Sequence, residues 1–374
     1  MAEFLYIHIP FCVTKCIYCD FLSIPYDANL AERYTEALCR ELELKKEQAQ
    51  VLKTVYIGGG TPSILPEPCL RQIFTCLKRN YTLASSSEIT IEANPGTLTA
   101  QKIEGMLSDG VNRLSLGVQS FRDDELHTLG RIHTAEEAVR SVHNARVAGL
   151  NNLSLDLMYG IPGQTISSWK DTLSTAIALC PNHVSAYELT PEKGTHLNHL
   201  LETGSLVLPA EYPVLEMYDC AIDTLTASGF EQYEISNYAI PGYRCSHNIN
   251  YWSRGEYLAA GAGAHGFIRG RRSRNTENIR DYIENLSRDV IPEAESSEIT
   301  CEEALREFIF LGMRKTEGIR LSDADELGMK IAEAAVGLVR EGLAELTCGH
   351  IRLSRKGLPL ANTVIVRLLT GLGL

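Results

Sequence analysis

Short apolar segments alternate with helix-like segments along the first 230 residues of the chain. Each apolar segment is rich in Val, Ile, Leu or Tyr and is bounded by Gly, Pro or Asn, which is typical of buried strands. The predicted strands span residues 5–9, 54–57, 88–92, 113–118, 153–157 and 183–189. Helical spacing of apolar residues predicts helices near 67–79, 99–108, 134–148, 166–179 and 211–228, and an earlier one that begins at Asn29. This alternation predicts a parallel sheet with right-handed crossovers and helices on both faces.

Polar residues lie where several of these predicted strands end. The second strand runs into the glycine-rich segment 58–62, and later strands carry Glu92, Gln119, Asp156 and Glu188 near their ends. In a (β/α) barrel the carboxyl ends of the strands converge on one mouth, where the active site lies. The sequence therefore predicts an α/β fold, a partial (β/α)6 TIM-like barrel, with a candidate site at that mouth.

The pattern changes beyond about residue 230. One further strand is predicted at 230–238, and a helix at 331–341 is followed by two short strands at 343–346 and 350–353. A helix followed by a hairpin is typical of a winged helix. We therefore predict a barrel over 1–230, an extension over 231–295 and a small C-terminal helical, winged-helix-like domain over 296–374.

Composition narrows the function classes. The chain has 374 residues and a formal net charge of −12, which disfavours a nucleic-acid-binding protein. No apolar run is long enough for a transmembrane segment, and no secretory signal is visible. Eleven cysteines without such a signal indicate reduced thiols in the cytoplasm, where clustered cysteines suggest metal binding.

Three of these cysteines, Cys12, Cys16 and Cys19, fall together on the predicted loop after the first strand. A disulfide is disfavoured in the cytoplasm. Three thiolates around an iron–sulfur cube would leave one iron free, and an open coordination position distinguishes a catalytic metal site from a structural one. A zinc site completed by His8 is the alternative.

Further candidate ligand-binding groups lie near the same mouth. The glycine-rich segment 58–62 lets backbone N–H groups approach a small zwitterion, although it could also be only a tight turn. It lacks the lysine of a phosphate-binding loop. Glu92 and Asp156 could accept hydrogen bonds from an ammonium group or ribose hydroxyls, Gln119 adds an amide, and Arg131 could pair with a carboxylate. A salt bridge or a helix cap is the alternative for each of them.

A second candidate site is the segment 245–252, which contains the pattern HNxxYW. The neutral imidazole of His247 suits haem iron, and Cys245 is a rival thiolate ligand. Tyr251 and Trp252 could pack on a porphyrin face. The alternative is a buried histidine among aromatic core residues. The arginine-rich run 269–274 could pair with propionates or form a solvated loop.

Several motifs in register carry a family resemblance: YIHIPFC at 6–12, the three-cysteine loop, GGGTP at 58–62, GVQSF at 117–121 and DLMYGIPG at 156–163. With them the chain resembles the radical S-adenosylmethionine (SAM) proteins, and more closely the oxygen-independent coproporphyrinogen III oxidase group, over nearly its whole length. The resemblance implies a [4Fe–4S] cluster on Cys12, Cys16 and Cys19, with SAM on the fourth iron. It implies a cofactor site lined by Tyr6, Tyr18, Gly59, Gly60, Thr61, Glu92, Gln119, Arg131 and Asp156. It also implies an electron donor such as flavodoxin or ferredoxin.

Two departures distinguish the chain from the decarboxylating oxidases of that group. Those enzymes resemble C-x-x-x-C-x-x-C-x-C, whereas here the last position is Phe21, and they carry an extension before the cluster, whereas only eleven residues precede Cys12. The HNxxYW pattern instead resembles that of the haem chaperones in the group. This resemblance implies that the chain binds haem with His247 involved, and delivers it to respiratory proteins from the cytoplasm, with membrane contact during delivery. The alternative function is oxidative decarboxylation of coproporphyrinogen III to protoporphyrinogen IX.

Overall fold

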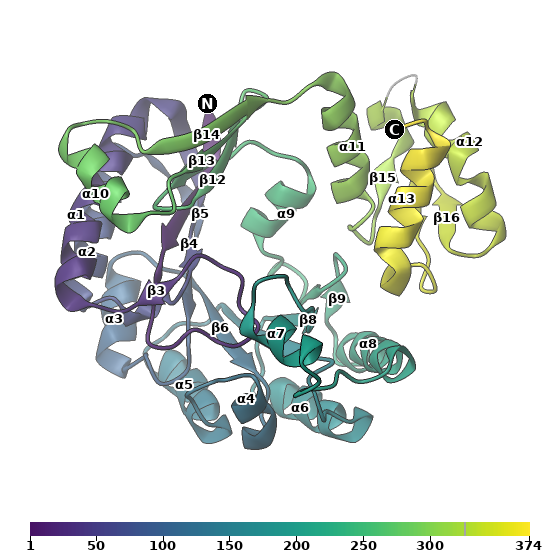
Figure 1. The fold of residues 1–374 in the computed structure, drawn as a ribbon, viewed down its shortest axis with the longest axis horizontal. Coiled ribbons are helices and arrows are strands. Elements are labelled where there is room, and N and C mark those ends of the chain that lie inside the picture. The colour runs from purple at the N-terminus through teal and green to yellow at the C-terminus, as the bar shows by residue number, and fades with distance from the viewer. Residues whose placement is uncertain (325–326) are drawn as a thin grey trace.

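The computed structural model describes residues 1–324 and 327–374 of the chain. Its centre is a curved nine-stranded sheet with the order β11-β1-β4-β5-β6-β7-β8-β10-β9 (Figure 1). The six consecutive parallel strands are β1 (Ala2–Ile9), β4 (Ala49–Gly59), β5 (Leu83–Ala93), β6 (Arg113–Gln119), β7 (Leu153–Tyr159) and β8 (His183–Glu188). They overlap the six predicted strands, although β4 and β5 begin earlier than predicted, and the predicted partial barrel is confirmed.

Both edges of the parallel sheet are extended by strands from the later part of the chain. β11 (Leu258–Ala260) adds to β1 in parallel, and β10 (Asn237–Ala239) adds to β8 in antiparallel orientation. β10 pairs in turn with β9 (Glu231–Gln232). The single strand predicted at 230–238 is therefore wrong in detail, because the segment turns back on itself as a hairpin.

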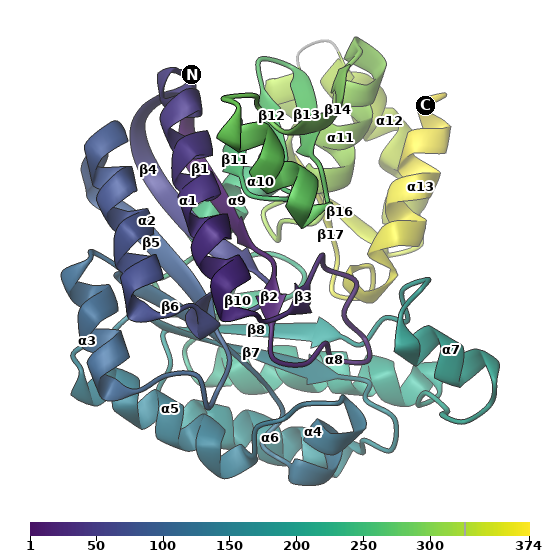
Figure 2. The same ribbon diagram turned by 60° about the vertical axis from the view of Figure 1, so that its left-hand side comes forward.

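Helices cover the convex face of the sheet (Figure 2). They are α1 (Ala28–Lys45), α2 (Glu67–Asn80), α3 (Ala100–Ser108), α4 (Asp123–Thr128), α5 (Ala135–Val147), α6 (Ile166–Ala178) and α8 (Glu211–Ala227). The short helix α7 (His196–Glu202) lies instead beside the three-cysteine loop, where the Leu197 N–H donates to the Ile17 carbonyl at 2.8 Å. The helices predicted from apolar spacing are confirmed, but the cap predicted at Asn29 is wrong. Asp27 is the N-cap of α1, because its side chain accepts a hydrogen bond from the backbone N–H of Leu30 at 2.8 Å.

The extension adds a small antiparallel sheet and two helices. These elements are α9 (Ser246–Trp252), β12 (His265–Ile268), β13 (Arg271–Asn275), α10 (Ile279–Ser287) and β14 (Glu293–Glu298). The interpretation of 269–274 as a solvated loop is wrong, since most of it forms β13. Its arginines pair with glutamates: Arg271 with Glu293, Arg272 with Glu307, and Arg274 with Glu277 and Glu295.

The C-terminal unit stands beside the barrel (Figure 1). It contains α11 (Cys301–Gly312), β15 (Ile319–Arg320), α12 (Leu327–Arg340), β16 (Ala344–Thr347), β17 (His350–Leu353) and α13 (Ala361–Gly371). The predicted hairpin is confirmed as β16 and β17, which follow α12 as in a winged helix. The domain boundaries at 230 and 295 stay predictions. None of the described helices has the length and hydropathy of a membrane span.

The two faces of the barrel strands differ in chemistry. Alternate residues such as Leu5, Ile57, Ile91, Leu116 and Leu155 are fully buried in the hydrophobic core. Residues between them point into the barrel and line a cavity: Tyr56, Glu92, Arg113, Ser115, Asp156, Ser185 and Tyr187. The apolar content of the strands predicted helices on both faces of the sheet, and this prediction is wrong. The strands alternate between an apolar outer face and a polar inner face.

Candidate active site

A cavity of about 370 Å³ lies at the carboxyl ends of the barrel strands. The predicted site residues that line it are Cys12, Cys16, Tyr18, Cys19, Gly59, Gly60, Thr61, Glu92, Gln119, Arg131 and Asp156. Tyr6 and His247 do not line it. The sequence placed these groups at one mouth from the ends of separate strands, and the fold brings nearly all of them into one cavity.

The cysteine loop is fixed at its base by two short paired strands, β2 (Phe11–Cys12) and β3 (Ile24–Pro25). Cys12, Cys16 and Cys19 are half-buried free thiols that face the cavity. The Sγ of Cys12 lies 3.6 Å from Thr61 Oγ1, and the Sγ of Cys16 lies 3.4 Å from Arg131 Nη1. Burial raises the pKa of the Cys19 thiol. A bound metal would oppose this shift by stabilising the thiolate.

The donor set fits an iron–sulfur cube better than a single ion. Among the described residues, no group of three or more His, Cys, Asp or Glu side chains is placed around one metal ion. The sulfurs that ligate a four-iron cube lie farther apart than those around one ion, and three soft thiols facing a cavity match that requirement. His8 does not complete a zinc site in this arrangement, because its Nδ1 is 2.9 Å from Tyr6 Oη and its Nε2 is 2.9 Å from the Leu22 carbonyl.

The glycine-rich segment after β4 packs tightly against the cysteine loop. Gly59 has φ +114°, and a Cβ there would lie 2.6 Å from the His8 ring. A Cβ on Gly60 would lie 2.6 Å from the Phe11 carbonyl oxygen and 3.0 Å from Cys12 Sγ. These glycines let the end of β4 approach the loop that carries the thiols. Tyr6 supports this packing indirectly, because its hydroxyl is hydrogen-bonded to the His8 ring that lies against Gly59.

Two carboxylates lie inside the barrel below this segment. Glu92 accepts hydrogen bonds from the Tyr56 hydroxyl at 2.7 Å and the Gly59 N–H at 3.0 Å. Burial raises the pKa of Glu92 to about 7. Burial also raises the pKa of Asp156, which accepts hydrogen bonds from the hydroxyls of Ser115, Ser154 and Ser185. Both carboxylates would be stabilised in their charged form by a cationic ligand in the cavity.

Arg131 and Gln119 form the opposite wall. The Arg131 Nη2 donates to Asn94 Oδ1 at 2.8 Å and to the Gly117 carbonyl at 2.6 Å. Gln119 has φ +67°, which is rare for a residue other than glycine, and it follows a register shift between β6 and β7. Such strain is concentrated at functional sites in proteins and here directs the end of β6 toward the cavity.

Sequence reasoning missed several cavity-lining residues. They are Tyr56, Asn94, Arg113, Ser115, Ser185, Tyr187 and Asn248. Two of them, Arg113 and Ser115, lie an even number of residues before Gln119 on the same strand. The period of two along β6 was therefore a signal that could have found these two, whereas nothing comparable in the sequence marked the others.

The HNxxYW segment forms α9, which lies against β4 inside the sheet's concave side (Figure 1). His247 is 1% exposed, with Nδ1 2.6 Å from Thr54 Oγ1 and Nε2 2.9 Å from Tyr251 Oη. Its ring stacks on Tyr56 at 5.2 Å, and burial lowers its pKa to about 3. Both ring nitrogens are engaged, so the predicted haem ligand is not open to iron in this conformation.

The rival ligand Cys245 is also enclosed. It is fully buried, its Sγ lies 3.5 Å from Glu88 Oε1, and burial raises its pKa to about 12. Tyr251 packs edge-on against Tyr257 with ring centroids 4.7 Å apart, and Arg314 lies over the Trp252 ring. Of this segment, Asn248 reaches the cavity. The alternative interpretation, a buried histidine among aromatic neighbours, describes this conformation.

Two family models match the chain. The model of the radical SAM superfamily matches residues 6–176, and the HemN C-terminal domain matches residues 299–360. The haem chaperone HemW of Bacillus subtilis (strain 168) is 38% identical over 367 residues, covering 96% of this chain and 97% of the relative. The haem chaperone HemW of Escherichia coli (strain K12) is 41% identical over 293 residues, covering 75% of each chain.

The chain belongs to the HemW family. This family assignment confirms the predicted radical SAM resemblance and, within that group, the predicted similarity to the haem chaperones.

The chain also shares its fold with a solved oxidase structure. Coproporphyrinogen III oxidase (HemN) from Escherichia coli, a radical SAM enzyme, superposes with a TM-score of 0.84 over 98% of this chain and 89% of that chain. The sequences are 21% identical, so the likeness establishes the fold and not the reaction. Phe21, which stands in place of a fourth cysteine, is 62% exposed and lies in the wall of the cavity.

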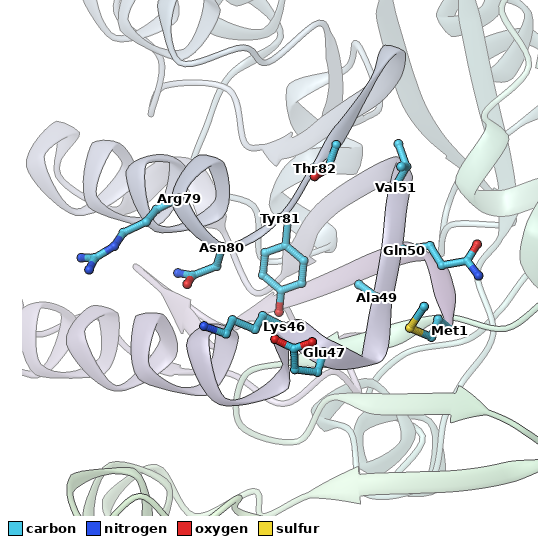
Figure 3. A pocket seen from close by; sticks show the side chains of 10 residues that line it. All are labelled: Met1, Lys46, Glu47, Ala49, Gln50, Val51, Arg79, Asn80, Tyr81 and Thr82. Carbon is cyan, nitrogen blue, oxygen red and sulfur yellow. The ribbon is translucent and has the colours of Figure 1, made fainter.

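A second hollow of about 600 Å³ is separate from the cavity that Cys12, Cys16 and Cys19 line. Figure 3 shows the residues around it. Its lining comes from the amino-terminal ends of β4 and β5 and the helix ends beside them, and includes Lys46, Glu47, Arg79 and Tyr81. The Tyr81 hydroxyl is already used, because it donates to the Leu42 carbonyl at 2.7 Å. In a barrel of this kind chemistry lies at the other end of the strands, and we assign no function to this hollow.

Proposed function

We propose that this chain is a haem chaperone that binds a [4Fe–4S] cluster, SAM and haem, and delivers haem to respiratory proteins. The observation that carries the proposal is the near-full-length similarity to relatives named haem chaperones. A cavity that joins three thiols to a polar barrel interior supports the cofactor part. Reduction of the cluster by flavodoxin or ferredoxin, and delivery in the cytoplasm with membrane contact, belong to the same proposal.

Each part of the cavity has a role in this proposal. Cys12, Cys16 and Cys19 would hold the cluster, and Arg131 beside Cys16 would orient the carboxylate of SAM. Glu92 would accept a hydrogen bond from the ammonium group of SAM, and Asp156 would accept hydrogen bonds from its ribose hydroxyls. SAM would lie along the edge formed by Gly59, Gly60 and Thr61. Tyr18 and Gln119 would complete the walls of the site. When bound, the cluster supplies the electron for reductive cleavage of the sulfonium.

Haem would enter the cavity from the side of α9, whose Asn248 belongs to the lining. Phe21 and Tyr187 present exposed aromatic surface at the cavity, which suits a planar tetrapyrrole. Ligation by His247 requires α9 to move, since the imidazole must leave Thr54 or Tyr251 to free a nitrogen. The lowered pKa of His247 keeps the imidazole neutral, the form that binds iron.

Haem titration of the anaerobically reconstituted chain tests this function. We expect saturable haem binding at about one per chain and no conversion of coproporphyrinogen III to protoporphyrinogen IX with SAM and a reductant. Turnover of coproporphyrinogen III would support the alternative, an oxidative decarboxylase. Absence of haem binding by a protein with an intact cluster would contradict the chaperone.

The affinity for SAM should depend on pH through Glu92. Below its pKa of about 7 the Glu92 carboxyl is protonated and no longer attracts a cation, so SAM binding weakens as pH falls. Between pH 8 and pH 6 we expect about a tenfold loss of affinity from this one proton. Calorimetric titration across this range measures it. A Glu92→Gln variant should bind SAM weakly at every pH in this range, because it lacks the carboxyl group whose protonation causes the loss.

Tyr56→Phe should move the pH dependence to higher pH. The Tyr56 hydroxyl donates to Glu92 and lowers the pKa of that carboxyl, so its removal raises the pKa. Protonation of Glu92 then begins at higher pH, and the midpoint of SAM binding follows. The exposed Tyr212→Phe is the matched control, and an identical midpoint in the Tyr56 variant would exclude the role given to Glu92.

A further inference from the structure

Arg113 is a buried cation whose hydrogen-bond donors are unused. It is the first residue of β6, it is 1% exposed, and its guanidinium lies in the wall of the cavity. Its Nε and Nη1 are both buried, and neither has a hydrogen-bond partner among the residues that the structure describes. A guanidinium stays charged at every physiological pH, so its buried N–H groups are costly to leave unpaired.

The neighbouring acids do not account for these free donors. Arg113 lies within electrostatic range of Glu88, Glu92 and Asp156. Each of these carboxylates takes its hydrogen bonds from other groups: Glu88 from the backbone N–H groups of Ser246 and His247, Glu92 from Tyr56 and Gly59, and Asp156 from Ser115, Ser154 and Ser185. The fork of Arg113 therefore remains available to a ligand.

The position of Arg113 separates it from the cluster end of the cavity. Arg131 lies beside Cys16, where a carboxylate close to the cysteines would be received. Arg113 starts β6, and Gln119 ends it at the mouth, which places their backbones roughly 20 Å apart along an extended strand. An anion held by Arg113 would lie deeper in the barrel than one held by Arg131. The cavity thus offers two guanidinium groups at two depths.

We propose that Arg113 receives a carboxylate of the ligand that occupies the floor of the cavity, and that this carboxylate is a haem propionate. The proposal rests on the proposed haem-binding function. A planar guanidinium binds a carboxylate through two parallel hydrogen bonds, which fix orientation as well as affinity. Asn248 of α9 also lines the cavity, so it and Arg113 are the groups that a propionate entering from that side would meet.

The test compares haem with its dimethyl ester, in which both propionates are uncharged. Each compound is dissolved in dimethyl sulfoxide at the same concentration and titrated separately into the reconstituted full chain. For the wild type we expect haem to bind about tenfold to a hundredfold more tightly than the ester, the usual effect of a charge-assisted contact. The ratio should fall to near one in Arg113→Met and to an intermediate value in Arg113→Lys. Arg140→Met, at an exposed site on α5, should retain the wild-type ratio.

The ratio of two affinities within one sample does not depend on the folded fraction, so a destabilised Arg113→Met variant remains informative. Equal binding of haem and ester by the wild type would overturn the proposal and leave the chaperone function standing. Failure to bind either compound would instead contradict the proposed function itself. A parallel titration with SAM and decarboxylated SAM covers the other source of a carboxylate. Arg113→Met could abolish the preference for SAM over decarboxylated SAM and leave the preference for haem over its ester unchanged. In that case the carboxylate bound by Arg113 belongs to SAM, and the propionate assignment is wrong.

Discussion

Cys16→Ala should reduce the reconstituted chain from about four iron atoms to a small residual content and remove its brown absorbance. The three thiols face one cavity from one short loop, so each is expected to supply one ligand to the cluster. Loss of one of the three protein ligands leaves two irons of the cube without a protein ligand, so the cluster is held less firmly and is lost from the protein. Iron and sulfide analysis with the visible spectrum measures the effect.

Cys301→Ala is the matched control for this prediction. Cys301 is an exposed free thiol at the start of α11, and its removal should leave iron content and absorbance unchanged. Equal iron content in Cys16→Ala and wild type would contradict the assignment of the loop. A drop in both variants would point to a reconstitution defect that does not depend on the loop.

His247→Ala should destabilise the protein even without haem. The substitution deletes a buried ring that stacks on Tyr56, and it leaves the hydroxyls of Thr54 and Tyr251 without their imidazole partner. The cavity and the two unpaired hydroxyls together should lower the free energy of unfolding by roughly 3 kcal/mol. Thermal unfolding of the haem-free chain, followed by circular dichroism, measures the loss.

The exposed His143→Ala on α5 should have no comparable effect on unfolding. Unchanged stability in His247→Ala would contradict the packing of α9 against β4. If the loss is found, weaker haem binding by this variant does not by itself identify His247 as the ligand. The ligand is then identified by the absorption spectrum of bound haem in His247→Gln, which keeps a polar side chain between Thr54 and Tyr251.

The sequence predicted the barrel because its signals are local. Each strand is a short apolar run, and Glu92 and Asp156 follow from their place near strand ends. The polar inner face was missed because residues such as Ser115 and Ser185 are small and do not interrupt an apolar segment visibly. The cap of α1 was misplaced by two residues, because Asp27 and Asn29 are equally good cap types and only the fold chooses between them.

Long-range packing explains the remaining errors. Nothing near His247 in the sequence shows that its imidazole meets Thr54, which lies 193 residues earlier. Likewise, the run 269–274 was open to interpretation as a solvated loop because most glutamate partners of its arginines come from β14 and α11, more than twenty residues on for Arg271 and Arg272. Arg113 was interpreted only as the start of a strand, because its unused donors become visible once the partners of the surrounding carboxylates are known.

The electron paramagnetic resonance spectrum of the reduced cluster, recorded with and without SAM, tests whether the barrel cavity places SAM on the open iron of a three-cysteine cluster. We expect SAM to shift the g values of the wild-type cluster, and we expect a weaker shift in Glu92→Gln. A well-formed reduced cluster whose spectrum is the same with and without saturating SAM would contradict this placement of SAM.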